Sequence, residues 1–298
     1  MIASPQALAG AAGSAMPLPP VLPEGLTGPG RRTLIMGVLN VTPDSFSDGG
    51  RFARRDDAIA QALRLEAEGA AIVDIGGEST RPGHAPVSAA QEIARVVPVI
   101  EAIAPRLAVA VSIDTYKAET ARAALAAGAR IVNDVWGLQR DPAIAEVAAE
   151  FGAPVVVMHN REAPDPSADV IDEFRRFFDI SIGIARRAGI PDGHIILDPG
   201  IGFGKTPAQQ IDALRRLPEL CAFGFPVLVG ASRKSILGRI ADRETRPDER
   251  LHSSIAAHVL AASLGAAIVR VHDVGPHREA LRVIDAVMHG STALREPA

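Results

Sequence analysis

The chain has 298 residues, of which 47% are hydrophobic, 22% charged and 4% aromatic, and its formal net charge is −4. The apolar fraction is that of a folded globular protein, and the length suits one α/β barrel. The acidic balance argues against nucleic-acid binding, and no apolar run approaches the roughly 20 residues of a membrane helix. A single cysteine, Cys221, excludes an intrachain disulfide and a cysteine cluster for zinc. We therefore expect a cytoplasmic protein that binds neither nucleic acid nor membranes.

The two ends of the chain differ in composition from the rest. Residues 1–30 are rich in Ala, Pro and Gly and hold one charged side chain, Glu24. They lack the basic n-region of a secretory signal and the arginines of a transit peptide. We predict a disordered or loosely packed N-terminal tail over 1–30, one folded domain over 31–290 and a C-terminal tail over 291–298.

Short runs rich in Val and Ile alternate with segments of helical periodicity along the folded part. Near-continuous apolar runs are typical of parallel strands that are covered on both faces. Stripes such as Ile144, Val147 and Phe151 predict helices between the strands. The expected strands are Leu34–Val41, Ala71–Gly76, Val109–Asp114, Arg130–Asp134, Pro154–His159, His194–Asp198, Pro226–Ala231 and Ala266–His272.

Glycines separate the expected helices from the strands that follow them. A helix commonly ends in a left-handed residue, which glycine adopts without steric cost. Eight β-then-α units in about 255 residues predict an α/β fold, a single-domain (β/α)₈ TIM barrel. The alternative is an open doubly wound sheet, which would normally have fewer strands and a G-x-G-x-x-G sequence after the first. The helix-ending glycines are Gly69, Gly128, Gly152, Gly189 and Gly265.

Polar side chains lie at the C-terminal end of every expected strand, where TIM barrels carry their active sites. Such groups cost desolvation energy unless they are paired, so their gathering at one rim indicates a polar binding site. The last two strands contribute cations, and this is where these barrels usually hold phosphate. The rim cations are Arg81, Arg233, Lys234, Arg270 and His272.

Asp114, Asn133 and Asp198 offer hydrogen-bond acceptors and an amide from three other strands of the same rim. This set suits a flat heterocycle with ring N–H and amino groups, such as a pterin or a purine. Together with the cations, it predicts a small phosphorylated ligand with a polar ring.

Several residues also have plainer interpretations. An Asp near a strand end often caps the following helix, which is what we expect of Asp74 and Asp134. His258 and His277 are expected to be surface or packing residues. The stretch from Gly200 to Thr206 resembles a Walker A phosphate loop but has proline where its first glycine would stand. A glycine-rich loop that lets a ligand approach the backbone explains this stretch better.

In chain order, these segments resemble the signatures of dihydropteroate synthase over about residues 34–288. The first two are long and specific: MGVLNVTPDSFSDG over 36–49 and GGESTRPG over 76–83. The later ones are SIDTYK (112–117), ND (133–134), DPGIGFGK (198–205), GASRKS (230–235) and RVHDV (270–274). The resemblance implies an enzyme that joins 6-hydroxymethyl-7,8-dihydropterin diphosphate to p-aminobenzoate, giving 7,8-dihydropteroate and pyrophosphate for folate synthesis.

The resemblance also implies roles for the rim residues. The catalytic residues would be Asp114, Lys234, Arg270 and His272. The pterin ring would be held by Asp114, Asn133, Asp198 and Lys234, and the diphosphate by Thr80, Arg270, His272 and the backbone of Val271. The p-aminobenzoate pocket would be bordered by Phe46, Arg81, Pro82, Phe203, Lys234 and Ser235. The one implied metal ligand is Asn40, for Mg²⁺ beside the diphosphate.

Chemistry connects these residue types to the implied reaction. Pyrophosphate would leave from a methylene attached to an electron-rich ring, so positive charge can develop at that carbon. Cations would stabilise the departing group, while Asp114 would offset charge building on the pterin. The arylamine then attacks the carbon, so no covalent enzyme nucleophile is needed. The loops that contain residues 49–50 and 82–83 would close over the site.

Three other functions stay open on the sequence alone. They are a pterin-binding methyltransferase domain with a corrinoid partner, a Schiff-base aldolase that uses Lys234, and a catalytically inactive pterin-binding paralogue. The intact motifs argue against the first and the last. Trp136 and Asn160 differ from the commonest family pattern and lie at the rim. The family usually forms homodimers through its outer helices, so the resemblance also implies a homodimer.

Overall fold

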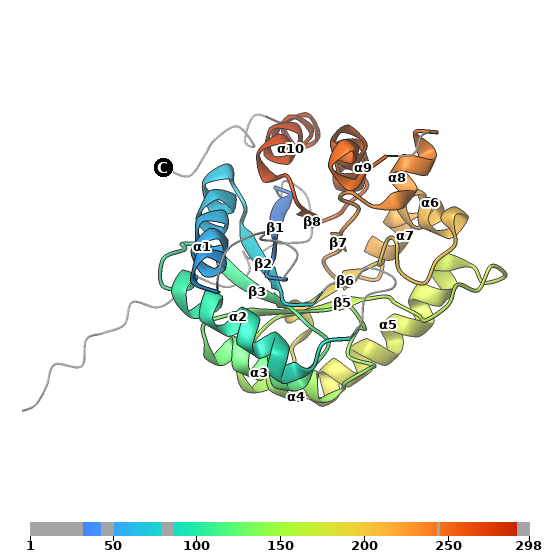
Figure 1. Cartoon of the computed structure of the whole chain (residues 1–298). Helices are drawn as coiled ribbons and strands as arrows, with labels where there is room; N and C mark the ends of the chain where they lie inside the picture. The colour runs from blue at the N-terminus through green and yellow to red at the C-terminus, as the bar shows by residue number, and fades with distance from the viewer. Residues whose placement is uncertain (1–31, 43–50, 79–85, 243–244, 291–298) are drawn as a thin grey trace, which may run out of the picture.

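A computed structural model describes residues 32–42, 51–78, 86–242 and 245–290. Within these ranges eight strands alternate with helices, and the helices surround the strands (Figure 1). The strands are β1 (Leu34–Asn40), β2 (Ile72–Gly76), β3 (Ala110–Asp114), β4 (Ile131–Asp134), β5 (Val155–Met158), β6 (Ile195–Asp198), β7 (Leu228–Val229) and β8 (Ile268–Val271). The expected (β/α)₈ fold class is confirmed.

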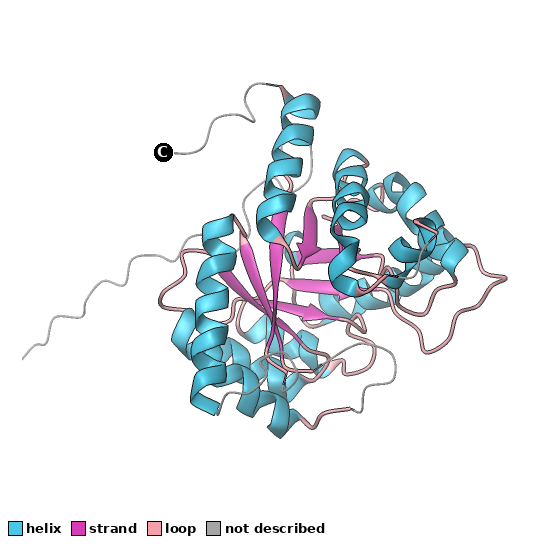
Figure 2. Ribbon diagram, turned by 45° about the horizontal axis from the view of Figure 1, so that its top comes forward, coloured by secondary structure: helices cyan, strands magenta, loops and turns pink. Residues whose placement is uncertain are grey.

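The strands pair in parallel in the order β6-β5-β4-β3-β2-β1-β8-β7. The remaining gap between β6 and β7 is bridged at Leu197 and Val227, where the Leu197 amide donates to the Pro226 carbonyl over 2.9 Å. The result is a nearly closed barrel (Figure 2). Strand β7 is shorter than the expected Pro226–Ala231 because only two of its residues form the ladder with β8.

Single helices follow most strands, and two helices follow both β6 and β7 in the described part of the chain. All five glycines predicted to end helices have positive φ, between 63° and 115°, which confirms that interpretation. The helices are α1 (Arg51–Glu68), α2 (Ala89–Ile103), α3 (Ala118–Ala126), α4 (Ala143–Glu150), α5 (Val170–Arg187), α6 (Pro207–Arg215), α7 (Leu217–Cys221), α8 (Ser235–Ile240), α9 (Leu251–Ser263) and α10 (Val274–His289). Short 3₁₀ turns lie at Asp192–His194 and Pro247–Arg250.

Helix α5 shows how the outer helices are held on the barrel. Its N-cap is Asp169, whose carboxylate accepts hydrogen bonds from two amides of the first turn. Phe174, Phe178 and Ile182 recur every four residues and bury one face of the helix. Each such side chain contributes roughly 1.5–3 kcal/mol through burial. The predicted stripe on α4 is right for Ile144 and Val147, but Phe151 follows the helix as its C-cap and is 42% exposed.

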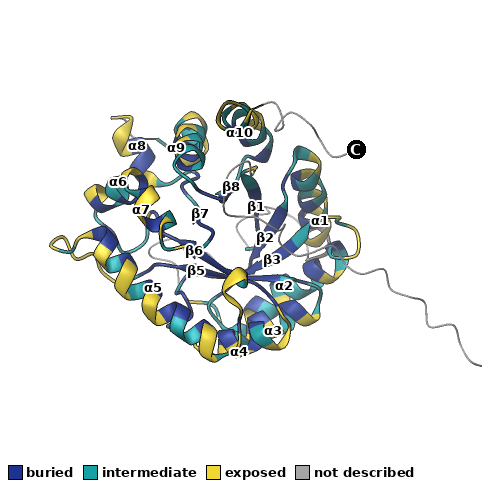
Figure 3. Ribbon diagram, turned by 180° about the vertical axis from the view of Figure 1, so that it is seen from behind, coloured by how far each residue is buried: buried dark blue, intermediate teal, exposed yellow. Residues whose placement is uncertain are grey.

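Side chains alternate along each strand between the helices and the barrel interior. Outward-facing Val and Ile residues form the main core with the helices, as the buried inner faces in Figure 3 show. Inside the barrel, near the N-terminal ends of the strands, a second and smaller cluster is entirely apolar. The buried members of this interior apolar cluster are Met36, Ile72, Ile131, Val156, Ile196, Leu228, Ala267 and Ile268. The polar residues lie beyond it, toward the C-terminal ends.

Candidate active site

The strand register brings three predicted site residues, from β1, β3 and β4, to one level of the barrel. Asn40 pairs with Gly76, Gly76 with Asp114, and Asp114 with Asn133. A Cβ added to Gly76 would lie 3.7 Å from Asp114 Oδ2 and 3.8 Å from Asn40 Oδ1. The missing side chain therefore leaves space between an amide oxygen and a carboxylate. Gly76 begins the motif GGESTRPG, but nothing in the sequence indicates that its missing side chain leaves this space.

Arg270 joins two buried carboxylates at the centre of the barrel. Its Nε donates to Asp74 Oδ2 and its Nη2 to Asp114 Oδ2, each over 2.6 Å. The Asn133 amide donates to the same Asp74 oxygen over 3.0 Å. The expectation that Asp74 caps a helix was wrong, because its side chain points into the barrel and holds Arg270 and Asn133. We name Asp74, Asp114, Asn133 and Arg270 the central polar network.

The central polar network is incompletely satisfied among the described residues. Asp74 Oδ1, Asp114 Oδ1 and the nearby Ser112 Oγ are buried there without a hydrogen-bond partner. Buried carboxylate oxygens without donors are costly, so native proteins nearly always pair them. The arrangement therefore suits a bound molecule that presents N–H groups to these oxygens.

Two carboxylates of the site titrate close to neutral pH. Burial raises the pKa of Asp114 to about 7; Arg270 opposes this shift and the negative charge of Asp74 adds to it. Burial also raises the pKa of Asp198 to about 6, although the Gly200 amide donates to its Oδ1 over 2.7 Å and lowers it. A carboxyl group with such a pKa can gain or lose its proton near neutral pH when a ligand binds beside it.

The β8 side of the rim carries less positive charge than the sequence predicts. Burial, with Arg270 and Arg233 nearby, lowers the pKa of His272 to about 3, so its imidazole is neutral. Its Nδ1 lies 3.0 Å from Ser232 Oγ. Arg233 is also occupied, because it forks onto both carboxylate oxygens of Asp273, over 3.0 and 2.6 Å. His272 is thus a neutral hydrogen-bonding group, while Arg233 and Arg270 both keep their charge next to carboxylates.

Lys234 lies at the N-cap of α8, and its Nζ is 4.0 Å from the centre of the Phe203 ring. This cation–π contact brings the β6 and β7 loops together. Ser235 follows as the first residue of α8 and is exposed, while Val271 at the end of β8 is fully buried. The structure thus confirms that Phe203 and Lys234 are neighbours.

Other polar strand ends have structural partners. Glu78 accepts hydrogen bonds from Tyr116 and Lys117. Asp134 accepts from the amides of Trp136 and Leu138, so it caps the turn after β4 and not a helix as expected. Asn160 donates to the Val135 carbonyl over 3.0 Å. Trp136 and Asn160, the two departures from the family pattern, therefore lie at one turn beside the rim.

Two buried histidines, His258 on α9 and His277 on α10, connect the loops that follow β7 and β8. The Ala231 amide donates to His258 Nε2 over 3.0 Å, so the proton of His258 is on Nδ1. That nitrogen lies 3.0 Å from His277 Nε2, and His277 Nδ1 lies 2.6 Å from the Asp273 carbonyl. His258 and His277 are therefore packing residues, as expected. Their hydrogen bonds also connect Ala231 after β7 to Asp273 after β8.

Four predicted site residues lie outside the described residues: Phe46, Thr80, Arg81 and Pro82. The two segments that contain them follow β1 and β2, whose described ends are Asn40 and Gly76. The remaining predicted residues are all present at the C-terminal end of the barrel, as TIM-barrel architecture requires.

Comparison with known proteins identifies the family of this chain. A family model described as pterin binding enzyme matches residues 36–272. A dihydropteroate synthase from Synechocystis sp. is 48% identical over 277 residues, which cover 90% of this chain and 96% of that protein. The chain belongs to the dihydropteroate synthase family. This membership confirms the resemblance that the motifs indicate.

Solved structures of dihydropteroate synthases share the fold. The Clostridium difficile enzyme, crystallised in the presence of pteroic acid, is 46% identical with a TM-score of 0.85, covering 88% of this chain and 99% of that one. The Xanthomonas albilineans enzyme in complex with 7,8-dihydropteroate is 45% identical with a TM-score of 0.78, covering 86% and 94%. The dihydropteroate synthase barrel is therefore the architecture of this chain.

Proposed function

We propose that this chain condenses 6-hydroxymethyl-7,8-dihydropterin diphosphate with p-aminobenzoate, releasing pyrophosphate and forming 7,8-dihydropteroate for folate synthesis. The observation that carries the proposal is the central polar network, with its unpaired buried acceptors beside Lys234 and Arg270. Family membership supports it, as does the structure of a relative in complex with 7,8-dihydropteroate.

The pterin ring would be recognised by the acceptors of the network. A dihydropterin presents ring N–H and amino groups along one edge, and Asp114 Oδ1 and the Asp198 carboxylate can accept from them. Asn133 adds an amide from the neighbouring strand, while its own donation to Asp74 fixes its orientation. Because these groups sit on strands, the site is held more rigidly than one built on loops alone.

The reaction breaks the bond between the pterin methylene and the diphosphate oxygen and forms a carbon–nitrogen bond to the arylamine, which gives up a proton. Arg270 and Lys234 would stabilise the departing negative charge, and neutral His272 would donate a hydrogen bond to it. Ionised Asp114 would offset positive charge that develops on the pterin methylene. Arg270 contacts Asp114 directly, so the same guanidinium that would stabilise the leaving group also orients the Asp114 carboxylate.

Asn40 suits Mg²⁺ when the diphosphate completes the ligand set. Among the described residues, no group of three His, Cys, Asp or Glu side chains could hold a metal. Mg²⁺ is commonly held by one or two protein oxygens together with substrate phosphates and water. Asn40 Oδ1 would supply a protein oxygen at the open space beside Gly76. When bound, the ion would neutralise charge on the departing pyrophosphate.

We also propose that the chain forms a homodimer through its outer helices and works in the cytoplasm. Apolar residues are exposed on neighbouring helices: Leu260 on α9, and Val283 and Val287 on α10, the last with 74% of its surface exposed. None of the helices in the described ranges has the length and hydrophobicity needed to cross a membrane. Sedimentation of the purified protein, with Val287→Glu as the disrupting variant, tests the dimer.

The test of the proposed function is direct. Purified protein is mixed with Mg²⁺, the pterin diphosphate and radiolabelled p-aminobenzoate, and labelled dihydropteroate is measured with and without EDTA. Product that disappears with EDTA supports both the synthase and the metal. Tight pterin binding without product would identify the inactive paralogue, and methyl transfer to a corrinoid would identify the methyltransferase. Trapping of Lys234 by borohydride with a carbonyl substrate would identify the aldolase.

A further inference from the structure

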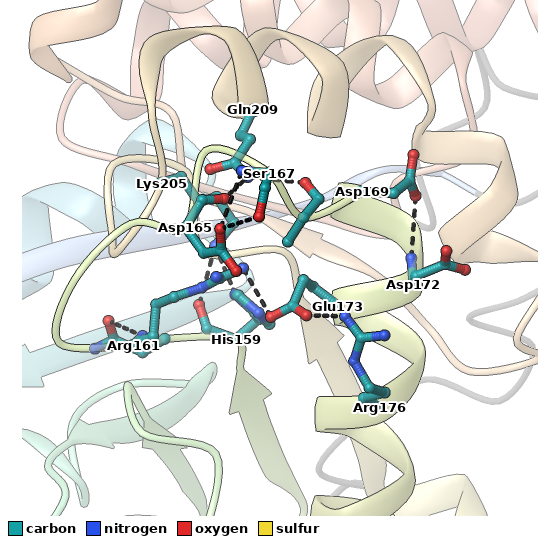
Figure 4. A network of polar contacts seen from close by, with 12 residues as sticks. His159, Arg161, Asp165, Ser167, Asp169, Asp172, Glu173, Arg176, Lys205 and Gln209 are labelled. Atoms are coloured by element: carbon teal, nitrogen blue, oxygen red, sulfur yellow. Dashed lines mark hydrogen bonds and ion pairs between the residues drawn. The ribbon is translucent and has the colours of Figure 1, made fainter.

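Lys205 is a buried lysine at which hydrogen-bond acceptors from two barrel loops converge. It is only 6% exposed, and its Nζ lies 2.7 Å from His159 Nδ1 (Figure 4). The carbonyl oxygens of Gly200 and Phe203 lie 3.1 Å from the same nitrogen, and that of His159 lies 3.3 Å away. Carbonyl oxygens can only accept, so Lys205 donates to both the end of β5 and the loop after β6.

One glycine of the β6 loop, Gly200, lies against this contact. Gly200, Gly202 and Gly204 have φ values of 64°, 88° and 50°, a conformation that favours glycine. A Cβ on Gly200 would lie 2.1 Å from the His159 carbonyl oxygen and 3.3 Å from Lys205 Nζ. The sequence analysis expected these glycines to let a ligand approach the backbone. The lysine that ends this stretch, Lys205, points toward His159 and the loop carbonyls.

The loop that Lys205 holds carries two groups of the proposed site. Asp198 begins it, and its backbone carbonyl accepts from the His159 amide over 2.9 Å. Its carboxylate accepts from Gly200, whose own carbonyl contacts Lys205. Phe203 carries the ring that packs under Lys234, and its carbonyl contacts Lys205 as well. The Lys205 ammonium group therefore contacts the backbone on both sides: at Gly200, which supports the Asp198 carboxylate, and at Phe203, which carries the ring.

We infer that Lys205 is a positioning residue for substrate binding: it clamps the β6 loop onto the end of β5, so that Asp198 and Phe203 are held in place for the pterin and the p-aminobenzoate. This inference rests on the proposed function. Lys205 does not itself contact the reacting atoms. Its loss therefore affects how well the substrates bind more than how fast they react, because Asp114 and Arg270 stand on other strands.

Burial disfavours the charged form of Lys205, and the acceptors around its Nζ offset part of that cost. Burial lowers the pKa of Lys205, and the nearby Asp198 opposes that shift. Burial and Lys205 together lower the pKa of His159, so the imidazole is neutral and Nδ1 accepts from Lys205. The rings of Phe174 and Phe177 pack on His159, with centroids 5.0 and 4.8 Å away, and fix its orientation. The contact between Lys205 and His159 is thus held in place by side chains of α5.

Arg161 provides a matched control in the same cluster. It lies two residues after His159, and its Nη2 contacts Glu173 on α5 over 2.8 Å (Figure 4). It also packs on the loop near Gly204, yet its ion pair is with Glu173 on α5 and not with the carbonyls around Lys205. Arg161→Met removes a neighbouring cation of similar length without removing the clamp.

The experiment compares wild type, Lys205→Met and Arg161→Met in the full chain. Kinetic constants for both substrates and hydrogen exchange of the segment 199–204 are measured, with thermal unfolding to verify folding. For Lys205→Met we expect KM for the pterin diphosphate to rise about 10-fold or more, with kcat changed less than about three-fold, and faster exchange in the segment. Arg161→Met is expected to keep KM within about two-fold of wild type.

Each outcome decides the inference. Wild-type KM and exchange in a folded Lys205→Met would overturn it, as would a fall in kcat at constant KM. If Lys205→Met does not fold, Lys205→Gln keeps part of the hydrogen bonding and should give a smaller rise in KM; an unchanged KM there also overturns the inference. A wild type that forms no dihydropteroate refutes the proposed function instead, and the exchange measurement still tests the clamp.

Discussion

The N-terminal half of the barrel interior is apolar and the C-terminal half is polar, although the same strands form both. Near the N-terminal ends, Ile72, Ile131 and Ile268 point inward as members of the interior apolar cluster. Two residues further along β2, β4 and β8, the inward positions belong to Asp74, Asn133 and Arg270. The change takes place over a single strand repeat.

The apolar half stabilises the fold, whereas the polar half is suited to binding a ligand. The apolar half needs only close packing, and its side chains gain free energy simply by being buried. The polar half buries carboxylates and leaves three of its oxygens without partners in the described part of the chain. Such groups reduce the free energy of unfolding, and they gain partners when a ligand with N–H groups binds. The comparison predicts separable effects of mutation.

The largest effect on function is expected for Asp114→Asn in the polar half. Loss of the negative charge removes its stabilisation of the developing positive charge, so kcat should fall about 100- to 1,000-fold. Pyrophosphate binding should change much less, because Arg270, Lys234 and His272 remain. Steady-state kinetics and calorimetry with pyrophosphate measure the two. Equal losses in both would contradict the role of Asp114.

The same variant should reveal the cost of the polar half in stability. The folded pKa of Asp114 is raised to about 7 from an ordinary value near 3.8. Its stabilising contribution is therefore present below the ordinary value and is lost as the pH rises through about 7. Thermal unfolding should show Asp114→Asn gaining Tm relative to wild type between pH 5 and pH 8. If the difference in Tm between the two proteins did not change with pH, burial would not raise the pKa of Asp114 in the folded state.

In the apolar half, Ile196→Ala should act on stability and not on catalysis. Ile196 is fully buried in the interior apolar cluster, so the substitution should lower the free energy of unfolding by about 2–5 kcal/mol. Denaturant unfolding measures the loss, and kcat should stay within about three-fold of wild type. A large fall in kcat at constant stability would show that the two halves are not separable.

The pH profile should identify the titrating group of the polar half. If ionised Asp114 is required, kcat/KM for the pterin diphosphate rises with pH through about 7. Asp74→Asn removes a negative neighbour that raises the pKa of Asp114, so the midpoint should move to lower pH. Asp198 has its own pKa of about 6, which is set mainly by burial, the Gly200 amide and Lys234. An unmoved midpoint in Asp74→Asn would assign the profile to another group.

The smallest expected effect concerns the open space at Gly76. An added Cβ there would meet Asp114 and Asn40 at ordinary contact distances of 3.7 and 3.8 Å, so Gly76→Ala should fold normally. It should raise KM for the pterin diphosphate about 3- to 10-fold, since a methyl group fills part of the space between the two side chains. Gly37 makes a poor control because a Cβ there meets Val274 at 3.1 Å; Gly193, with nothing within 4 Å, is a better one.

The sequence by itself determined the architecture of this protein. Val and Ile runs separated by amphipathic helices and helix-ending glycines leave few ways to bury every apolar face, and the (β/α)₈ barrel is one of them. The sequence also predicted that Asp114, Asn133, Asp198 and Arg270 share one rim of the barrel, because each occurs at or near the end of an expected strand. Local pattern was sufficient for both.

Only the tertiary structure decided which polar groups cooperate and in what charge state. Asp74 lies in mid-strand, and its pairing with Arg270 spans 196 residues of chain, so local sequence indicated only a helix cap. His272 loses its charge through burial, and Lys205 turns toward carbonyls at the end of a neighbouring strand. Burial and long-range hydrogen bonds depend on where the strands close in space, which a one-dimensional pattern does not contain.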